Sequence, residues 1–148
     1  MEYTDFKKDF PKRTIDILNG YKCEYNVTLL LNCLLALLVL PKEKFYDNIP
    51  EEIPPDWGLT KEHIQKVQCQ VCGYKLKNIV LNMRHAIAHL DVKTTKDYKG
   101  NIEKVRFKNR SKFIAEIPVG DLKTFVIKLT KYVIESEKNQ NQRILCSN

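Results

Sequence analysis

Apolar positions recur with the period of an α-helix over most of the chain. The first such segment, Tyr3–Leu18, contains Pro11 and is followed by Gly20, a residue that suits a helix C-terminus. The second, Glu24–Val39, is apolar on nearly all sides and stops before Pro41. A helix without a polar face is usually buried, so we expect this one in the middle of a helical bundle or at a contact between subunits.

Three more helical segments follow an irregular stretch. Residues 42–58 contain three prolines and a tryptophan, which predicts an ordered surface loop without regular structure. A short helix is expected at Thr60–Gln68, a long one at Tyr74–Leu90 and the last at Gly120–Ser136. The buried stripes of the two long helices comprise Leu76, Ile79, Val80, Met83, Ile87 and Leu90 in the first and Leu122, Phe125, Val126, Leu129 and Val133 in the second.

The segment before the last helix has a different period. Between residues 91 and 118, apolar and polar positions alternate in VRFKN and KFIAEI, and DYKGN has the composition of a turn. This predicts a small β-hairpin, with a third short strand possible. The expected fold is therefore mainly all-α: an up-and-down helical bundle with a β-hairpin at about residues 92–118, inserted before the last helix. Residues 1–138 would form one domain and residues 139–148 a flexible tail.

Length and composition are those of one globular domain. A chain of 148 residues with 43% hydrophobic and 29% charged residues does not resemble a disordered protein. Its five cysteines suit reduced thiols in a cytoplasmic protein better than a disulfide framework. The polar start MEYTDFKKDF does not predict a signal peptide, and the longest apolar run, Val27–Leu40, is shorter than a bilayer span. No membrane partner is expected, with a re-entrant segment as the alternative.

The positive charge of the chain is concentrated in the predicted hairpin. Lys and Arg exceed Asp and Glu by 25 to 18, a net charge of +7 that favours polyanionic partners. From Lys93 to Lys112, eight cations are interleaved with Tyr98 and Phe107, a pattern that can bind an RNA backbone without reading its sequence. The alternative is that these lysines only solvate the strands or protect a sheet edge. The candidate RNA-binding residues here are Lys104, Arg106, Lys108 and Arg110.

The segment NMRHAIAHL, residues 82–90, carries the candidate chemistry. With an upstream cysteine pair, its histidines complete C-x2-C-x12-H-x3-H, the ligand spacing of a zinc finger. The ligands would be Cys69, Cys72, His85 and His89. Such a finger also needs an aromatic residue and a leucine at two core positions, where this chain has Leu76 and Asn82. We therefore expect no metal here and keep a zinc-dependent nucleic-acid binder as a less favoured alternative.

The same helix has an unusual polar face. The residues opposite its apolar stripe are Asn78, Asn82, His85 and His89. Asparagine and histidine form helices less readily than the lysine and glutamate that usually face water, which indicates a role other than solubility. These residues could line an RNA site or, alternatively, hydrogen-bond to the loop of residues 42–58. Arg84 lies between the two stripes beside Leu81 and Ala88, neighbours that would let another helix or a second copy approach.

An arginine and a histidine in one cleft suit phosphodiester chemistry. A guanidinium disfavours the charged form of a nearby imidazole, which can then accept a proton near neutral pH. Arginine binds the non-bridging oxygens of a phosphodiester and stabilises charge as it develops. RNA supplies its own nucleophile, the 2′-OH, whereas DNA would normally require a metal or a protein nucleophile. Arg84 and His89 therefore favour RNA as the substrate and need no cofactor.

Arg84, HAIA and His89 form an R-x4-H motif near the end of a late helix. This motif resembles the signature of the HEPN superfamily (higher eukaryote and prokaryote nucleotide-binding domains), and the segments YNVTLLLNCLLALLVLPKEKFYDNIP and LNMRHAIAHLDV resemble its plasmid- and defence-associated bacterial branch. The resemblance implies a HEPN-type bundle and a metal-independent endoribonuclease, in which Arg84 and His89 of two subunits line a cleft at the homodimer interface. It implies His89 as general base or acid and His85 as an accessory polar residue. The product would carry a 2′,3′-cyclic phosphate.

Two features limit what the resemblance implies. In the toxin branch whose antitoxin adds AMP to a tyrosine, the motif continues as R-x4-H-x-Y, whereas this chain has Asp91 at the tyrosine position. That mode of control is therefore not expected. On a regular helix Arg84 and His89 would point about 140° apart, so the helix must end or bend near Ala88, or two subunits must supply the pair.

The expected function is that of a toxin or phage-defence effector that cleaves RNA. Its expected partners are RNA, a second copy of the chain and a possible antitoxin or regulatory protein. The rival is a non-catalytic HEPN-like module that holds a nucleotide or a partner protein in the same cleft. Binding without turnover would distinguish this rival from a ribonuclease.

Overall fold

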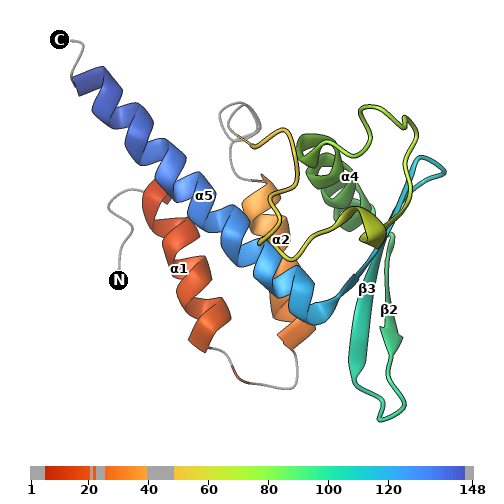
Figure 1. Ribbon diagram of the computed structural model, residues 1–148. Helices are drawn as coiled ribbons and strands as arrows, with labels where there is room; N and C mark the ends of the chain where they lie inside the picture. The colour runs from red at the N-terminus through yellow and green to blue at the C-terminus, as the bar shows by residue number, and fades with distance from the viewer. Residues whose placement is uncertain (1–5, 21, 23–25, 40–48, 146–148) are drawn as a thin grey trace.

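The computed structural model describes residues 6–20, 22, 26–39 and 49–145 (Figure 1). Within these residues the chain forms helices packed beside one antiparallel sheet. The α-helices are α1 (Phe6–Gly20), α2 (Asn26–Val39), α4 (Leu76–Ala88) and α5 (Val119–Leu145), and a 3-10 turn, η1, covers Lys61–His63. The strands are β1 (Ile64–Lys66), β2 (Val92–Lys96), β3 (Ile102–Asn109) and β4 (Phe113–Pro118).

The fold is α+β, so the expectation of a mainly all-α bundle with a small hairpin was wrong. The strands form a four-stranded sheet in the order β1-β4-β3-β2, with antiparallel neighbours. The alternating pattern did predict β3 and β4, and β2 is the third short strand that the sequence left possible. The missing strand is β1, which pairs Ile64 with Ala115 and lies where a helix was expected at Thr60–Gln68. Three residues with one buried side chain are too short to show a period of two.

One face of the sheet forms part of the core. Its buried side chains, all 0–1% exposed, are Val105 and Phe107 of β3 and Phe113, Ala115 and Ile117 of β4. Helices α4 and α5 pack against these strands. The alternate residues of β3 point to the other face, which no described helix covers (Figure 1). The sheet therefore has one apolar side and one side that faces solvent.

The helices complete the core from the other side. The long helix α5 packs along α1 and crosses α2, which also contacts α4 (Figure 1). Phe125 and Leu129 of α5 and Ile79 and Met83 of α4 are fully buried, and each such side chain contributes roughly 1.5–3 kcal/mol through removal from water. The expected stripes of α4 and α5 thus face the core, apart from Leu90, which lies beyond the end of α4.

Helix α2 is not buried on all sides within one chain. Leu30 and Leu34 are inside the core, but Leu29, Leu31 and Leu35 keep part of their surface exposed. The sequence indicated either a central helix or a subunit contact for this segment. The described chain therefore leaves apolar area on α2 that it does not cover itself.

The described part of the loop before η1, residues 49–58, contains no helix or strand, as its proline content predicted, and it packs against α5, which the sequence did not predict. Trp57 is 6% exposed, and its ring centroid lies 6.3 Å from that of Phe125 and 5.6 Å from that of Tyr132. Gly58 has φ +78°, and a Cβ there would lie 2.6 Å from the carbonyl oxygen of Asp121. The remaining residues of the expected loop, 42–48, lie outside the described residues.

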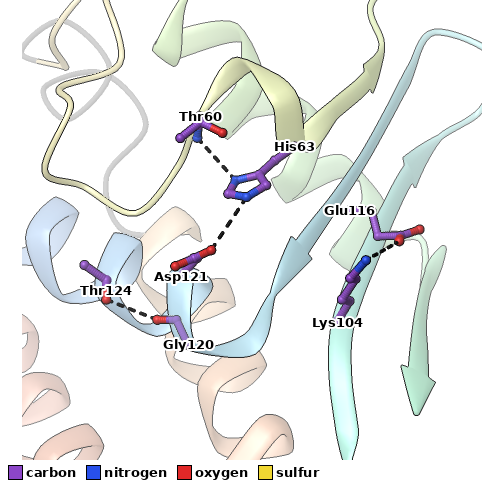
Figure 2. A network of polar contacts seen from close by, with 7 residues as sticks. All are labelled: Thr60, His63, Lys104, Glu116, Gly120, Asp121 and Thr124. Atoms are coloured by element: carbon purple, nitrogen blue, oxygen red, sulfur yellow. Dashed lines mark hydrogen bonds and ion pairs between the residues drawn. The ribbon is translucent and has the colours of Figure 1, made fainter. Parts of the chain in front are cut away.

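His63 joins η1 to the first turn of α5 (Figure 2). The backbone N–H of Thr60 donates to His63 Nδ1 at 3.2 Å, and His63 Nε2 lies 3.6 Å from Asp121 Oδ2. Because Nδ1 accepts a hydrogen bond, the ring proton is placed on Nε2, facing the carboxylate. The contact connects the start of α5 to the segment that enters β1.

Two further findings concern the helices as a group. Helix α5 continues to Leu145, whereas the sequence favoured an end near Ser136. The segment expected as a flexible tail is therefore helical as far as Leu145. No helix in the described part of the chain combines the length and apolar character needed to span a bilayer.

Candidate functional site

Helix α4 carries the R-x4-H motif, and its start is held by Glu51. The backbone N–H of Leu76, which has no partner within the helix, donates to the Glu51 carbonyl oxygen at 3.0 Å. The side chain of Lys75, at the N-cap, forms an ion pair with the Glu51 carboxylate, and the hydrogen bond of this pair lowers the pKa of Glu51. The loop of residues 49–60 therefore anchors the first turn of α4.

The C-terminus of α4 ends within the motif. Asp91 N–H donates to the Ala86 carbonyl oxygen at 2.8 Å and Leu90 N–H donates to the Ile87 carbonyl oxygen at 3.0 Å, the two hydrogen bonds of a Schellman motif. The left-handed position, usually glycine, is Leu90 with φ 56°, and this leucine is 89% exposed. Such a conformation costs a residue with a Cβ roughly 1–2 kcal/mol. The helix thus stops at Ala88 despite a local cost.

The end of the helix changes the position of the second motif residue. His89 is the C-cap, with φ −97° and ψ 7°, and its N–H still donates to the His85 carbonyl oxygen at 3.0 Å. The sequence required the helix to end or bend near Ala88 if Arg84 and His89 were to converge within one chain. The helix does end at Ala88, and His89 is the first residue beyond it.

His85 and His89 lie together at the exposed end of α4. Their rings are nearly parallel, with an interplanar angle of 10° and centroids 6.4 Å apart. Both side chains are exposed, whereas Arg84, on the flank of the helix, is half-buried. Within the described residues, no hydrogen bond or ion pair engages the Arg84 guanidinium. Three basic side chains are therefore presented within two turns of one helix, two of them accessible from solvent.

The asparagines of the polar face have structural partners. Asn78 Nδ2 donates to the Cys72 carbonyl oxygen at 2.6 Å, and Asn82 Nδ2 donates to the Asn78 carbonyl oxygen at 2.7 Å. Asn109, at the end of β3, donates to Asn82 Oδ1 at 2.8 Å. Asn78 and Asn82 therefore form internal hydrogen bonds, as the alternative interpretation expected. Their partners lie in the turn before α4, in α4 itself and in the sheet, however, and not in the loop of residues 42–58. The polar face splits into a bonded half and an exposed histidine half.

The structure does not assemble the zinc-finger ligand set. Cys69 and Cys72 lie in the turn before α4, while His85 and His89 lie at its other end. Over the residues that the structure describes, no group of three or more His, Cys, Asp or Glu side chains could hold a metal ion. The four predicted ligands therefore do not meet at one site.

The candidate RNA-binding cations project from the solvent face of the sheet. Lys104, Arg106 and Lys108 alternate with buried residues along β3, and Arg110 follows in the turn to β4 with φ 49°. Asn109 points to the opposite face, where it meets α4. The cations and the two histidines therefore lie on different surfaces, joined by the short connection from His89 into β2.

The solvent face holds two cations that the sequence did not single out as binding residues. Lys93 of β2 lies directly opposite Arg106, and Lys66 of β1 lies opposite Ile114. Like charges directly across a strand pair repel each other. Only Lys104 has an acidic partner among the described residues of this face, Glu116 at 3.7 Å (Figure 2). The alternation of apolar and polar residues predicted that the cations of β3 share one face of the sheet. Lys66 could be assigned to this face only from the pairing of β1 with β4.

A pocket of 510 Å³ lies between the turn before α4 and the sheet. Cys69 and Cys72 line one side, Asn78 and Asn82 another, and Lys112 of the β3–β4 turn contributes a cation. Cys69 and Cys72 were considered only as metal ligands from the sequence, and Lys112 only as one basic residue among many. The pocket is separate from the exposed histidine pair.

Comparison with known proteins identifies one family. The model of the family described as HEPN pEK499 p136 matches residues 1–140, nearly the whole chain. No curated protein and no solved structure gave a significant match. The match covers the sheet and the described helices except the last residues of α5, and it confirms the resemblance inferred from the R-x4-H segment. The chain belongs to the HEPN pEK499 p136 family, and thereby to the HEPN superfamily.

Proposed function

We propose that this protein is a metal-independent endoribonuclease that acts as a homodimer, of the kind used as a toxin or a phage-defence effector. The observation that carries the proposal is the exposed end of α4, where His85 and His89 stack beside the half-buried Arg84 in a chain of the HEPN superfamily. These side chains can move a proton and bind a phosphate.

In the proposed reaction the 2′-oxygen of RNA attacks the adjacent phosphorus. His89 removes the proton from the 2′-OH or delivers one to the departing 5′-oxygen, and Arg84 binds the non-bridging oxygens as charge develops on them. The imidazole of His85, which is nearly parallel to that of His89, lies near the same phosphate. The products are a 2′,3′-cyclic phosphate and a 5′-hydroxyl end.

The proposal includes a second copy of the chain. A single α4 offers one Arg84, and on a regular helix this residue and His89 would point about 140° apart. Two copies packed along the flank of α4 that carries Arg84 would bring the arginine of one beside the histidines of the other. The half-exposed Leu29, Leu31 and Leu35 of α2, which contacts α4, provide apolar area for such an association.

The solvent face of the sheet is the proposed RNA-binding surface. The cross-strand neighbours Lys93 and Arg106 repel each other when no anion is present, and a phosphate between them would remove this cost. Strand β2 starts three residues after His89, so RNA bound on this face can reach the end of α4 around the β2 edge. Asn78 and Asn82 would then support the site through α4 instead of touching RNA.

The test is cleavage of a short labelled RNA in excess EDTA, with analysis of the product ends. Cleavage that persists in EDTA, leaves a cyclic phosphate and is lost in Arg84→Ala and His89→Ala supports the proposal. His63→Ala is the matched histidine control, because His63 contacts Asp121 at the start of α5 and takes no part in the proposed site. This variant should keep its ribonuclease activity. Thermal unfolding should verify that each variant is folded.

Three outcomes would refute the proposal. Equal cleavage by the parent and by both site variants would identify a contaminating nuclease. Loss of cleavage only in EDTA would indicate a metal-dependent reaction. Nucleotide binding that His89→Ala weakens, with no RNA product from the parent, would favour the non-catalytic module.

A further inference from the structure

The turn before α4 holds two thiols at neighbouring positions. Cys69 and Cys72 are three residues apart, and the Gly73 N–H donates to the Cys69 carbonyl oxygen at 2.8 Å, which closes the turn. The Cys72 N–H donates to Cys69 Sγ at 3.3 Å. Residues three apart in a closed turn have Cα atoms within about 7 Å, close to the range that a disulfide spans. The structure shows both as free cysteines.

Packing around Gly73 keeps the turn in this shape. A Cβ at Gly73 would lie 2.3 Å from the Cys69 carbonyl oxygen and 2.6 Å from the Val67 Cβ, so no other residue fits without moving the backbone. On the other side, the Cys72 carbonyl oxygen accepts hydrogen bonds from Asn78 Nδ2 at 2.6 Å and from the Lys75 N–H at 3.2 Å. The backbone that carries the two cysteines is therefore held by packing at Gly73 and by hydrogen bonds to the Cys72 carbonyl oxygen.

The two thiols differ in acidity. A hydrogen bond from the Cys72 thiol, followed by hydrogen bonds from the backbone N–H groups of Cys72 and Val71, lowers the pKa of Cys69. The same thiol contact, followed by desolvation, raises the pKa of Cys72. The thiolate is the reactive form of cysteine in exchange reactions. Cys69 therefore has the character of an attacking thiol and Cys72 that of a resolving thiol.

Both thiols are accessible. Cys72 is exposed, Cys69 is half-exposed, and both line the pocket of 510 Å³. Lys112 places a cation at this pocket, which suits an anionic peptide-like disulfide. Cys33 offers a contrast within the same chain, because it is buried and burial raises its pKa.

We propose that Cys69 and Cys72 form a thiol–disulfide exchange site that reacts with a low-molecular-weight disulfide such as oxidised glutathione. The Cys69 thiolate attacks one sulfur of that disulfide, forming a mixed disulfide and releasing one glutathione thiolate. Cys72, deprotonated, then attacks Cys69 Sγ and releases the second glutathione as a thiolate, which leaves a Cys69–Cys72 disulfide. Two protein thiols are oxidised and one glutathione disulfide is reduced to two thiols, so atoms and electrons balance. This site does not depend on the proposed ribonuclease function.

The test is peptide mapping of the native protein after equilibration with oxidised and reduced glutathione and acid quenching. Trypsin cleaves after Lys66 and Lys75, so both cysteines fall in one peptide, VQCQVCGYK. Oxidation should make this peptide two hydrogens lighter with no partner attached, and reducing agent should restore it. The tryptic peptide of residues 23–42 contains Cys23 as well as Cys33, so fragment ions must assign any modification to one of the two. Cys33, which is buried, is the internal control and should stay reduced in the native protein.

Serine and alanine variants separate the two roles. In Cys72→Ser, Cys69 should accumulate as the glutathione mixed disulfide, at least about tenfold faster than Cys33 is modified. In Cys69→Ser, Cys72 should react more slowly than Cys69 does in Cys72→Ser. Because serine can still donate a hydrogen bond and alanine cannot, the pH midpoint for alkylation of Cys69 should be higher in Cys72→Ala than in Cys72→Ser.

Each contrary result would overturn the proposal. A mixed disulfide that persists on wild-type Cys69 would show that Cys72 does not resolve it. Equal reactivity of Cys69 and Cys33 would show that the turn does not activate the thiol. Zinc bound at one equivalent or one half per chain, lost in Cys69→Ser and required to keep both cysteines unreactive, would assign the pair to a metal shared with other ligands.

Discussion

The side-chain amide of Asn109 donates a 2.8 Å hydrogen bond to Oδ1 of Asn82, which joins the end of β3 to the middle of α4. Asn82 in turn donates to the Asn78 carbonyl oxygen, and Asn78 donates to the Cys72 carbonyl oxygen. One chain of amides therefore connects the sheet, the motif helix and the cysteine turn. The position of α4 relative to the sheet depends on this chain as well as on apolar packing.

Removal of either end of the Asn82–Asn109 contact should destabilise the protein. Asn82→Ala and Asn109→Ala are each expected to lower the free energy of unfolding by about 1–2 kcal/mol, because the remaining partner loses its hydrogen bond in a half-buried site. The double variant should lose less than the sum of the two. Urea unfolding of all four proteins measures the coupling, and additive losses would show that the two residues act independently.

Replacement of Leu90 by glycine should stabilise the fold. Leu90 has φ 56° and is 89% exposed, so Leu90→Gly relieves backbone strain and removes few contacts, with an expected gain of about 1 kcal/mol. Leu90→Ala is the matched control, because alanine keeps the Cβ and most of the strain. Thermal unfolding compares the three proteins. A stable glycine variant with weakened dimerisation would show that the leucine side chain is used at an interface.

Loss of charge at Arg106 should weaken RNA binding and leave the fold intact or slightly more stable. Arg106→Gln removes the repulsion with Lys93, and it removes one candidate phosphate contact. The slope of log affinity against log salt should fall by roughly 1, without a change in sequence preference. Filter binding at several salt concentrations measures this slope. Unchanged binding and slope would indicate that these cations only solvate the sheet.

Mixing two inactive proteins tests whether the catalytic pair is supplied by two subunits. If Arg84 of one copy works with His89 of the other, a heterodimer of Arg84→Ala and His89→Ala contains one site with both residues and one with neither. Activity should return to about a quarter of the parent value after equal mixing and subunit exchange, since half of the dimers are mixed and each has one complete site. If both residues come from the same chain, each site in the mixed dimer lacks one of them and the mixture stays inactive.

The ion pair between Glu51 and Lys75 should contribute stability that depends on pH. The hydrogen bond from Lys75 lowers the pKa of Glu51 in the folded protein. A depressed carboxyl pKa contributes stability above the unfolded pKa of about 4.3, and this stability is lost as pH falls through the folded value. The melting temperature of Glu51→Gln should therefore be below that of the parent at pH 7, and the difference should shrink below about pH 4. A constant difference across this range would assign the effect to the neutral contacts of residue 51.

The sequence predicted the buried side of an element wherever the element was long enough to show a helical or strand period. The stripes from Leu76 to Ile87 and from Leu122 to Leu129 predicted the buried sides of α4 and α5, and VRFKN predicted that alternate cations of β3 share one face. In β1 only Ile64 is buried, and its partner Ala115 is far away in the chain. The short strand was therefore mistaken for a helix, and the sheet for a hairpin.

Contacts between distant polar residues were the other source of error. The unusual asparagines of α4 signalled a role other than solubility, but their partners, Asn109 and the Cys72 carbonyl oxygen, became evident only from the fold. The end of α4 was also hidden, because leucine rarely occupies the left-handed position of a helix terminus. Propensity placed the end of the helix near residue 90, and tertiary structure ended it two residues earlier.

The described edges of the sheet have a consequence for how copies of the chain can associate. Strand β1 has only three residues, and β2, the opposite edge, is exposed from Lys93 to Lys96 with a lysine at each end and an irregular register after Thr95. A short edge and a lysine-rich, irregular edge are poor templates for adding a strand from another molecule. Growth by edge-to-edge pairing is thereby discouraged, which protects an exposed sheet from open-ended aggregation and leaves side-chain packing as the means by which two copies can meet.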